Sequence, residues 1–253
     1  MYIRECYRFF AMYFQLLLLA SCSSAATLPK APFLRPCAQD NPHFNDCALE
    51  SAKYGLPIVA KGDRSLGIPP LNPLHIPEVK VDDRSFTLTL HDALVYGLEN
   101  AIPEKIEFNF EKRNINMEFT LPVFKAISKY AIDGKFLLLP IKGDGDFNGT
   151  SINGKLRVNQ GYNFKKINGK DHMEVVDMKV TFMPQRFYLT LTNLFNGDKT
   201  LGDHMNAFLN ENWKVVYEEL RPTLESTFET ILTSVTTSFF NAIPYEEILP
   251  KTL

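Results

Sequence analysis

The sequence of 253 residues lacks an excess of either charge, since 27 Lys and Arg stand against 29 Asp and Glu, a formal net charge of −2. Nucleic-acid-binding proteins usually carry a basic excess, so we expect no nucleic-acid partner. Tryptophan is scarce, with one residue against 20 Phe and 10 Tyr, so phenylalanine supplies most of the large apolar side chains. With 45% apolar and 22% charged residues, the composition excludes a disordered chain, a collagen-like repeat and a polytopic membrane protein.

Patterns that carry catalysis or bind metals are equally scarce. No two of the five histidines have the spacing of metal ligands. The nucleophile-elbow pattern is absent, because Asp63 occupies the place of the first glycine in residues 63–67. We therefore expect no catalytic residue, no metal and no cofactor, and we predict that the protein is not an enzyme.

Residues 143–149 carry the closest approach to a metal motif. Asp144, Asp146 and Asn148 match the first half of an EF-hand calcium loop, but Lys155 stands where the bidentate Glu belongs. Strand patterns flank the segment, so a tight acidic turn is favoured over a calcium site. Asn148-Gly149-Thr150 is also the only N-glycosylation sequon, and a glycan on Asn148 would exclude metal binding by that amide.

The first 26 residues have the anatomy of a secretory signal peptide. Arg4 and Arg8 give a positive start, residues 9–20 are largely apolar, and small residues 21–26 provide a cleavage site after Ala26. The alternative is an uncleaved signal anchor. The longest apolar run in the remainder, residues 136–141, is too short to cross a bilayer. We therefore expect one secreted, extracellular domain over residues 27–253, with no integral membrane association.

Cysteine counting agrees with secretion. Of the four cysteines, Cys6 and Cys22 leave with the signal peptide, so Cys37 and Cys47 remain as an even pair in an oxidising compartment. No other thiol is left in the mature chain, so we predict a disulfide between them. The short loop that it closes is worth about 2–3 kcal/mol by the chain-entropy argument.

The N-terminal half predicts an arm, a helix and then a sheet. Residues 27–41 are Pro-rich and extended, and Asn41-Pro42 start a helix that Gly55 and Pro57 should stop. From about residue 79 to residue 194, apolar and polar residues alternate, which predicts seven to nine antiparallel strands. Glycine-containing turn signals separate the strands of this meander: three residue pairs at 133–134, 153–154 and 168–169, and one triplet at 143–145.

The C-terminal tail has a helical period. From Asp203, one apolar stripe contains Met205, Phe208, Leu209, Asn212, Val216, Leu220, Leu224, Phe228, Ile231, Val235 and Phe239. Pro222 should kink or briefly break this helix. A single helix over residues 203–241 would be about 58 Å long, whereas a compact domain of this size is about 45 Å across. A sheet curved around the helix solves this mismatch and leaves an apolar tunnel between them.

Several blocks in order along the chain resemble one known family. They are NPHFNDC at residues 41–47, LGIPPLNPL at 66–74, LPIKGDG at 139–145, NLFNGDKTLGD at 193–203, NAFLNENW at 206–213 and ELRP at 219–222. On these residues the chain is similar to the insect takeout and haemolymph juvenile-hormone-binding proteins. Juvenile-hormone-binding members often have a second disulfide in the sheet region, which this chain lacks, so it looks closer to the takeout branch.

The resemblance implies a fold and a function. The fold would be the α+β tubular lipid-binding (TULIP-like) one, in which a strongly curved antiparallel β-sheet wraps a long C-terminal α-helix. The function would be a secreted carrier, in haemolymph or another extracellular fluid, for a small elongated lipophilic ligand that is fatty-acid-like, terpenoid or juvenile-hormone-like. The family's N-terminal disulfide would correspond to Cys37 and Cys47. No receptor or protein partner is identified by the sequence.

The two sides of the expected tunnel supply the candidate ligand-binding residues. The helix contributes Phe208, Val216, Leu220, Leu224 and Phe228, and the sheet contributes Phe108, Phe119 and Phe182. The alternative function is a secreted signalling or interaction protein with a mostly filled core, influencing feeding or circadian behaviour as the resemblance implies. A lipid-active hydrolase is a third possibility, but it would need a nucleophile with an adjacent base, and no motif here provides one.

Overall fold

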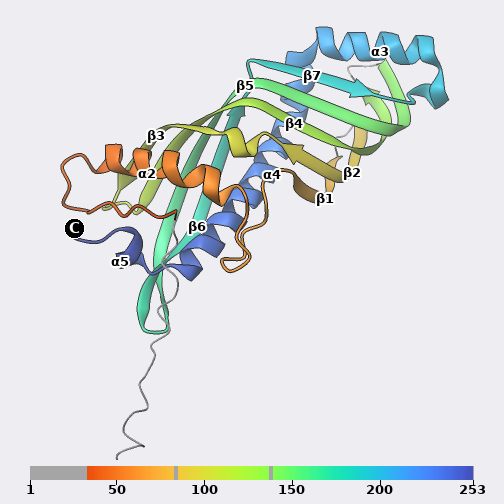
Figure 1. Cartoon of the computed structure of the whole chain (residues 1–253). Coiled ribbons are helices and arrows are strands. Elements are labelled where there is room, and N and C mark those ends of the chain that lie inside the picture. The colour runs from red at the N-terminus through yellow and green to blue at the C-terminus, as the bar shows by residue number, and fades with distance from the viewer. Residues whose placement is uncertain (1–32, 83–84, 137–138, 253) are drawn as a thin grey trace, which may run out of the picture. The chain divides into compact units, whose positions relative to one another are not determined.

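Two very long neighbouring strands form the centre of one antiparallel sheet (Figure 1). They are β4 (Asn114–Phe136) and β5 (Leu139–Ile167), and their pairing runs from Asn114 opposite Gly161 to Phe136 opposite Leu139. This computed structural model describes residues 33–252 except 83–84 and 137–138, so the predicted signal peptide lies outside the described residues.

Shorter strands follow one another along both outer edges of this central pair. Strands β3 and β2 pair with the first and second halves of β4, and β1 pairs with β2. On the other side, β7 and β6 pair with the first and second halves of β5. These strands are β1 (Leu74–Asp82), β2 (Phe86–Tyr96), β3 (Ile102–Asn109), β6 (Lys170–Met183) and β7 (Arg186–Leu191). The described residues thus form seven strands, within the predicted number.

Three of the four predicted turns are wrong, because their glycines lie inside the central strands. Only Asn168-Gly169 forms a turn, between β5 and β6. A Cβ atom on Gly134 would lie 2.4 Å from the Ser85 carbonyl oxygen, and one on Gly154 would lie 2.3 Å from the Phe182 ring. Another backbone or ring therefore approaches each position so closely that only glycine fits.

The helices also depart from the sequence prediction at their ends. Helix α2 (Phe44–Val59) continues through Gly55 and Pro57, which were expected to stop it. The C-terminal tail forms α3 (Lys199–Glu211) and α4 (Trp213–Ala242), followed by the short α5 (Tyr245–Ile248). Two single 3₁₀ turns, η1 (Leu98–Asn100) and η2 (Phe195–Gly197), complete the elements.

The break in the helical tail lies at Asn212 and not at Pro222. The Asn212 backbone N–H and side-chain amide both donate to the Phe208 carbonyl, which ends α3, and its own carbonyl accepts the first hydrogen bonds of α4. Helix α4 runs unbroken through Pro222. Pro222 and Glu218 are both exposed, so water can solvate the Glu218 carbonyl that the proline leaves without its helical partner.

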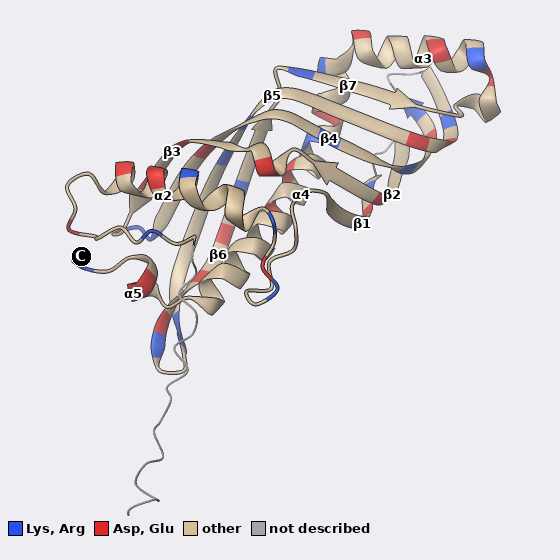
Figure 2. Cartoon of the chain, in the orientation of Figure 1, with Lys and Arg blue, Asp and Glu red and all other residues tan. Residues whose placement is uncertain are grey.

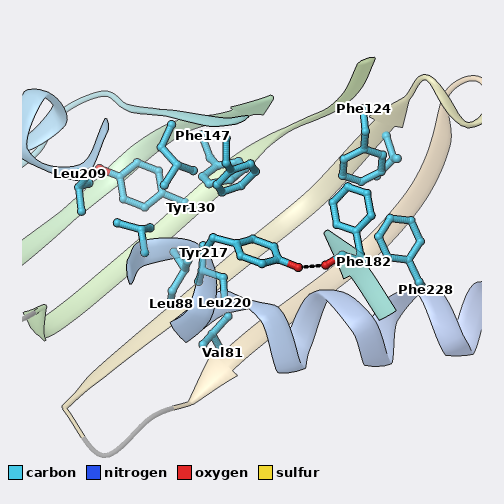
Figure 3. Packing of buried hydrophobic residues seen from close by; sticks show 14 of the residues in the cluster. Val81, Leu88, Phe124, Tyr130, Phe147, Phe182, Leu209, Tyr217, Leu220 and Phe228 are labelled. Atoms are coloured by element: carbon cyan, nitrogen blue, oxygen red, sulfur yellow. Dashed lines mark hydrogen bonds between the residues drawn. The ribbon is translucent and has the colours of Figure 1, made fainter. Parts of the chain in front are cut away.

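Helix α4 packs along the sheet and contacts β6, β7 and β1 (Figure 1). Its apolar stripe joins the main core, where the rings of Phe124, Phe182 and Phe228 lie with centroids 5.3–5.9 Å apart (Figure 3). This confirms the predicted α+β fold in which a long C-terminal helix packs on an antiparallel sheet.

Polar side chains of α3 close the edge of the sheet at β7. The Asn206 amide accepts from the Leu191 N–H and donates to the Leu191 carbonyl, both at 2.9 Å. The Asn210 amide makes the same pair of bonds with Leu189, at 3.0 and 2.6 Å. Each asparagine therefore supplies the donor and the acceptor that a neighbouring strand would supply.

Helix α4 continues this arrangement along β6. Glu225 accepts from the Phe182 N–H and Glu229 accepts from the Val180 N–H, each at 3.1 Å. The Tyr217 hydroxyl donates to the Phe182 carbonyl (Figure 3), and burial raises the pKa of this tyrosine above its usual range. A four-residue step on a helix rises about 6 Å and a two-residue step on a strand about 6.7 Å, so the two repeats match closely enough for successive bonds.

The close approach at Gly154 gives the first prediction. We expect Gly154→Ala to lower the free energy of unfolding by about 1–3 kcal/mol, because the new methyl group meets the buried Phe182 ring. Gly202→Ala is the matched control: its Cβ would meet nothing closer than 3.7 Å inside α3, so it should raise stability by about 0.5–1 kcal/mol. Urea unfolding measures both, and equal effects at the two sites would contradict the packing argument.

The edge bonds of α3 give the second prediction. Asn210→Ala leaves the N–H and carbonyl of Leu189 without partners, so the free energy of unfolding should fall by about 2 kcal/mol or more. The exposed Asn100→Ala is the control and should change stability by less than about 0.5 kcal/mol. Chemical denaturation of both variants tests this, and an Asn210→Ala protein as stable as the control would show that the edge bonds contribute nothing.

Candidate functional site

Three apolar cavities follow one another along the helical tail. Their volumes are about 30, 70 and 300 Å³, and their helical walls include Val216, Phe228 and Phe239, respectively. Phe147 lines both of the smaller cavities. The structure thus divides the expected tunnel into three parts, and the largest part lies at the C-terminal end of α4.

The 300 Å³ cavity lies where the arm (residues 33–43) and α2 meet the sheet. Its walls come from the arm, α2, strands β3, β4 and β5, the end of α4, and Ile248 and Leu249 after it. Figure 1 shows α2 crossing β3, with α5 nearby, and α2 contacts β3 directly. The volume is at the lower end of the range for small-molecule pockets, and the walls are almost wholly apolar. We define this cavity as the candidate site.

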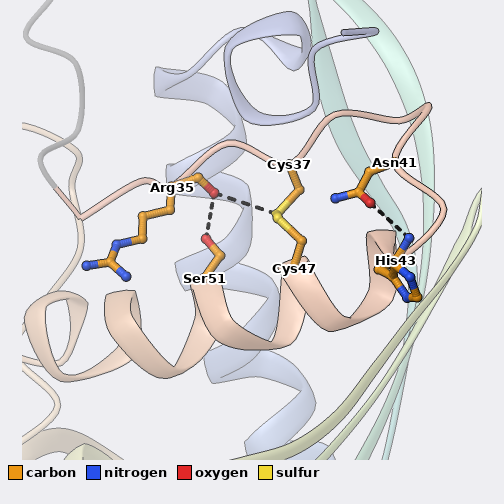
Figure 4. Close-up of a disulfide and its surroundings, with 6 residues drawn as sticks. All are labelled: Arg35, Cys37, Asn41, His43, Cys47 and Ser51. Carbon is orange, nitrogen blue, oxygen red and sulfur yellow. Dashed lines mark hydrogen bonds between the residues drawn. A yellow bond between two sulfur atoms is a disulfide. The ribbon is translucent and has the colours of Figure 1, made fainter. Parts of the chain in front are cut away.

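The arm is fastened to α2 beside the candidate site (Figure 4). Cys37 and Cys47 form the predicted disulfide, with their Cα atoms 5.9 Å apart, which confirms the pairing. The Ser51 hydroxyl adds a 2.8 Å hydrogen bond to the Arg35 carbonyl. Cys37 and Ser51 both line the cavity, so these links hold two of its walls together.

The arm is also tied to the C-terminal segment. The Gln39 side chain donates to the Leu249 carbonyl at 2.6 Å, and the Gln39 N–H donates to the Pro250 carbonyl at 2.8 Å.

Among the described lining residues, Arg35 is the one that carries a charge, and its guanidinium stacks 3.5 Å from the centre of the Tyr54 ring. Behind the site, burial raises the pKa of Tyr162 to about 12.

The eight candidate ligand-binding residues do not gather in one cavity. Phe182 lines none of the three cavities and is packed in the ring cluster with Phe124 and Phe228, and Phe208 is half-buried against the core. The others divide as Phe108 and Phe119 in the 300 Å³ cavity, Leu224 and Phe228 in the 70 Å³ cavity, and Val216 and Leu220 in the 30 Å³ cavity.

The sequence analysis missed several residues of the candidate site. The α2 face with Ala48 and Ala52 was assigned only to the disulfide-linked helix, and Gln160 was not considered. Gln160 is 1% exposed and lies in phase with the buried Leu156 and Val158 on β5. A glutamine at an apolar position of an alternating strand is a signal that could have singled it out.

Residues 143–149 form part of β5 and not the tight turn that was expected. Asp146 of this segment forms an ion pair with Lys129 of β4, and Figure 2 shows basic and acidic residues side by side on these strands. Asn148 is half-buried, on the opposite face of β5 from the buried Phe147, and accepts a 3.4 Å hydrogen bond from Thr150 of its own sequon. Within the described part of the chain, no three His, Cys, Asp or Glu residues are grouped as metal ligands.

Across the described ranges of residues 33–252, no helix combines the length and the apolar character that crossing a bilayer requires.

Comparisons with known proteins agree on one family. Residues 15–250 match the haemolymph juvenile hormone binding protein (JHBP) family. The structure is similar to the crystal structure of Epiphyas postvittana Takeout 1, with a TM-score of 0.78. The two sequences are 28% identical, and the match covers 85% of this chain and 98% of that one.

Two curated relatives extend the comparison. The circadian clock-controlled protein daywake of Drosophila melanogaster is 27% identical over 179 residues, which are 66% of each chain. A putative beta-carotene-binding protein of Schistocerca gregaria is 21% identical over 213 residues, covering 83% of this chain and 85% of that protein. Together with the match over residues 15–250, these findings establish that the chain belongs to the haemolymph juvenile hormone binding protein family, whose members are non-catalytic proteins that bind small hydrophobic ligands.

Proposed function

We propose that the protein is a secreted carrier that holds a small elongated hydrophobic ligand in the 300 Å³ cavity. The observation that carries the proposal is the cavity itself, which is bordered by α2, the sheet and the end of α4 and lined by Phe108, Phe119 and Met117. The signal peptide of residues 1–26 and a single domain over residues 27–253 belong to the same proposal. Delivery into haemolymph or another extracellular fluid accords with the family and with the disulfide.

The binding energy of such a carrier comes from apolar burial. Each methylene group that leaves water contributes about 0.8 kcal/mol, so a ten-carbon chain gains about 8 kcal/mol before the costs of immobilising it. Fatty-acid-like, terpenoid and juvenile-hormone-like molecules all supply such a chain. The beta-carotene named for the locust relative is also a long apolar molecule.

The 30 and 70 Å³ cavities favour a second candidate function. They leave little free volume between the sheet and the first part of α4. A mostly filled core of this kind is expected for a signalling or interaction protein that carries no ligand. The circadian name of the Drosophila relative points the same way. A ligand recovered from the native protein separates the two functions.

If the protein is a carrier, it should be purified with a bound lipid, and a variant whose cavity is filled by a larger side chain should bind much less of that lipid. Organic extraction of the natively secreted protein, followed by mass spectrometry, should recover about one lipid per chain. Ala52→Trp places an indole in the cavity and should lower that amount at least tenfold, whereas Ala207→Trp, at an exposed position of α3, should retain it. A wild-type protein that yields no lipid and takes up no fluorescent fatty acid would favour the interaction protein.

We also propose that Asn148 carries an N-linked glycan. It lies on the face of β5 away from the buried Phe147 side chain, within an intact sequon. The peptide containing Asn148 from the secreted protein should show a glycan mass that an N-glycosidase removes. Thr150→Ala destroys the sequon and is the control; an unmodified wild-type peptide would refute the assignment.

A further inference from the structure

Gln160 is a polar residue in an otherwise apolar wall. It lies on β5 with Ile115 of β4 and Met178 of β6 as its partners in register. It lines the candidate site, is 1% exposed, and neither its amide nitrogen nor its amide oxygen has a hydrogen-bond partner. A buried amide without partners costs about 1–3 kcal/mol, so its presence at this position needs a reason.

The other polar side chains of the wall already have partners within the protein, two through hydrogen bonds and one through a ring contact. The Ser51 hydroxyl donates to the Arg35 carbonyl, and the Thr236 hydroxyl donates to the Leu232 carbonyl of its own helix at 2.7 Å. The Arg35 guanidinium is stacked on Tyr54. Gln160 is therefore the described polar group of this cavity wall with unused capacity to donate and to accept.

We propose that Gln160 binds the polar end of the ligand and selects a neutral lipid that carries a hydroxyl group, an inference that rests on the proposed carrier function. An amide offers two N–H donors and a carbonyl acceptor, and a hydroxyl both donates and accepts, so one hydroxyl satisfies both sides of the amide. An ether or ester oxygen only accepts, which leaves the Gln160 carbonyl unpaired.

A carboxylate fits this position poorly. It cannot donate to the amide carbonyl, and it would bring a charge into an apolar cavity at a high desolvation cost. Arg35, the one charged residue among the described lining residues, is exposed and its guanidinium is stacked on the Tyr54 ring. The cavity therefore selects among ligands by the hydrogen-bonding capacity of their polar end, while its apolar walls accept hydrocarbon chains of many kinds.

The test compares two isomers, decan-1-ol, whose oxygen can donate and accept, and 1-methoxynonane, whose oxygen only accepts. Their binding is measured by displacement of a fluorescent fatty alcohol from the full delipidated protein. Wild type should bind the alcohol about tenfold more tightly than the ether. Gln160→Met, an unbranched apolar replacement, should lose this preference because alcohol binding weakens while ether binding stays within about twofold. Thr230→Val, at an exposed position of α4 outside the cavity whose hydroxyl donates to the Ser226 carbonyl, should keep the wild-type ratio.

The outcomes separate this inference from the function on which it rests. If wild type binds neither isomer nor the probe, the carrier function fails. If wild type binds both isomers and Gln160→Met keeps the same ratio, the role of Gln160 is overturned and the carrier function stands.

Thermal unfolding gives a readout that does not depend on ligand. Delipidated Gln160→Met should unfold at a higher temperature than wild type, because an unpaired buried amide is replaced by an apolar side chain. A lower unfolding temperature would mean that the amide is satisfied in the ligand-free protein, for example by an internal water, and would overturn the proposal.

Discussion

The structure depends on how the helical tail closes one edge of the sheet. A sheet edge exposes N–H and carbonyl groups that must find partners, and here Asn206 and Asn210 of α3 and Glu225 and Glu229 of α4 provide them. Because a four-residue helical step nearly equals a two-residue strand step, one helical face can bond a strand repeatedly. These hydrogen bonds fix how each helix is rotated about its own long axis. The orientation of α4 in turn decides which of its side chains face the sheet.

With the rotation fixed, the packing along α4 decides where space remains. Near Phe228, aromatic rings from β4 and β6 fill the gap to the helix. Beyond Val235, the opposing surface changes to α2 and the arm, and the free volume rises to about 300 Å³. The candidate site is therefore built where a third layer is added to the helix and the sheet.

The parts of this fold that follow from residue periodicity were predictable, and the parts that follow from contacts across the chain were not. The 3.6-residue stripe of the tail and the alternation of the strands identified the architecture, and the cysteine count identified the disulfide. Gly154 was assigned to a turn, because the Phe182 ring that requires a glycine there is far away along the sequence. The candidate ligand residues were chosen on the helix and sheet alone, so the contribution of α2 to the cavity and the proposed role of Gln160 lay outside the prediction.

The bonds of Gln39 to Leu249 and Pro250 have a consequence for exchange of the cavity contents. The first and last segments of the described chain meet beside the cavity, and segments of this kind open locally at less cost than the central strands. Residues of both segments line the cavity, so their local opening would widen access to it, while the Cys37–Cys47 disulfide keeps the first segment attached to α2. In the carrier that we propose, the retention time of a bound ligand would then depend on local opening of these two segments as well as on the stability of the whole domain.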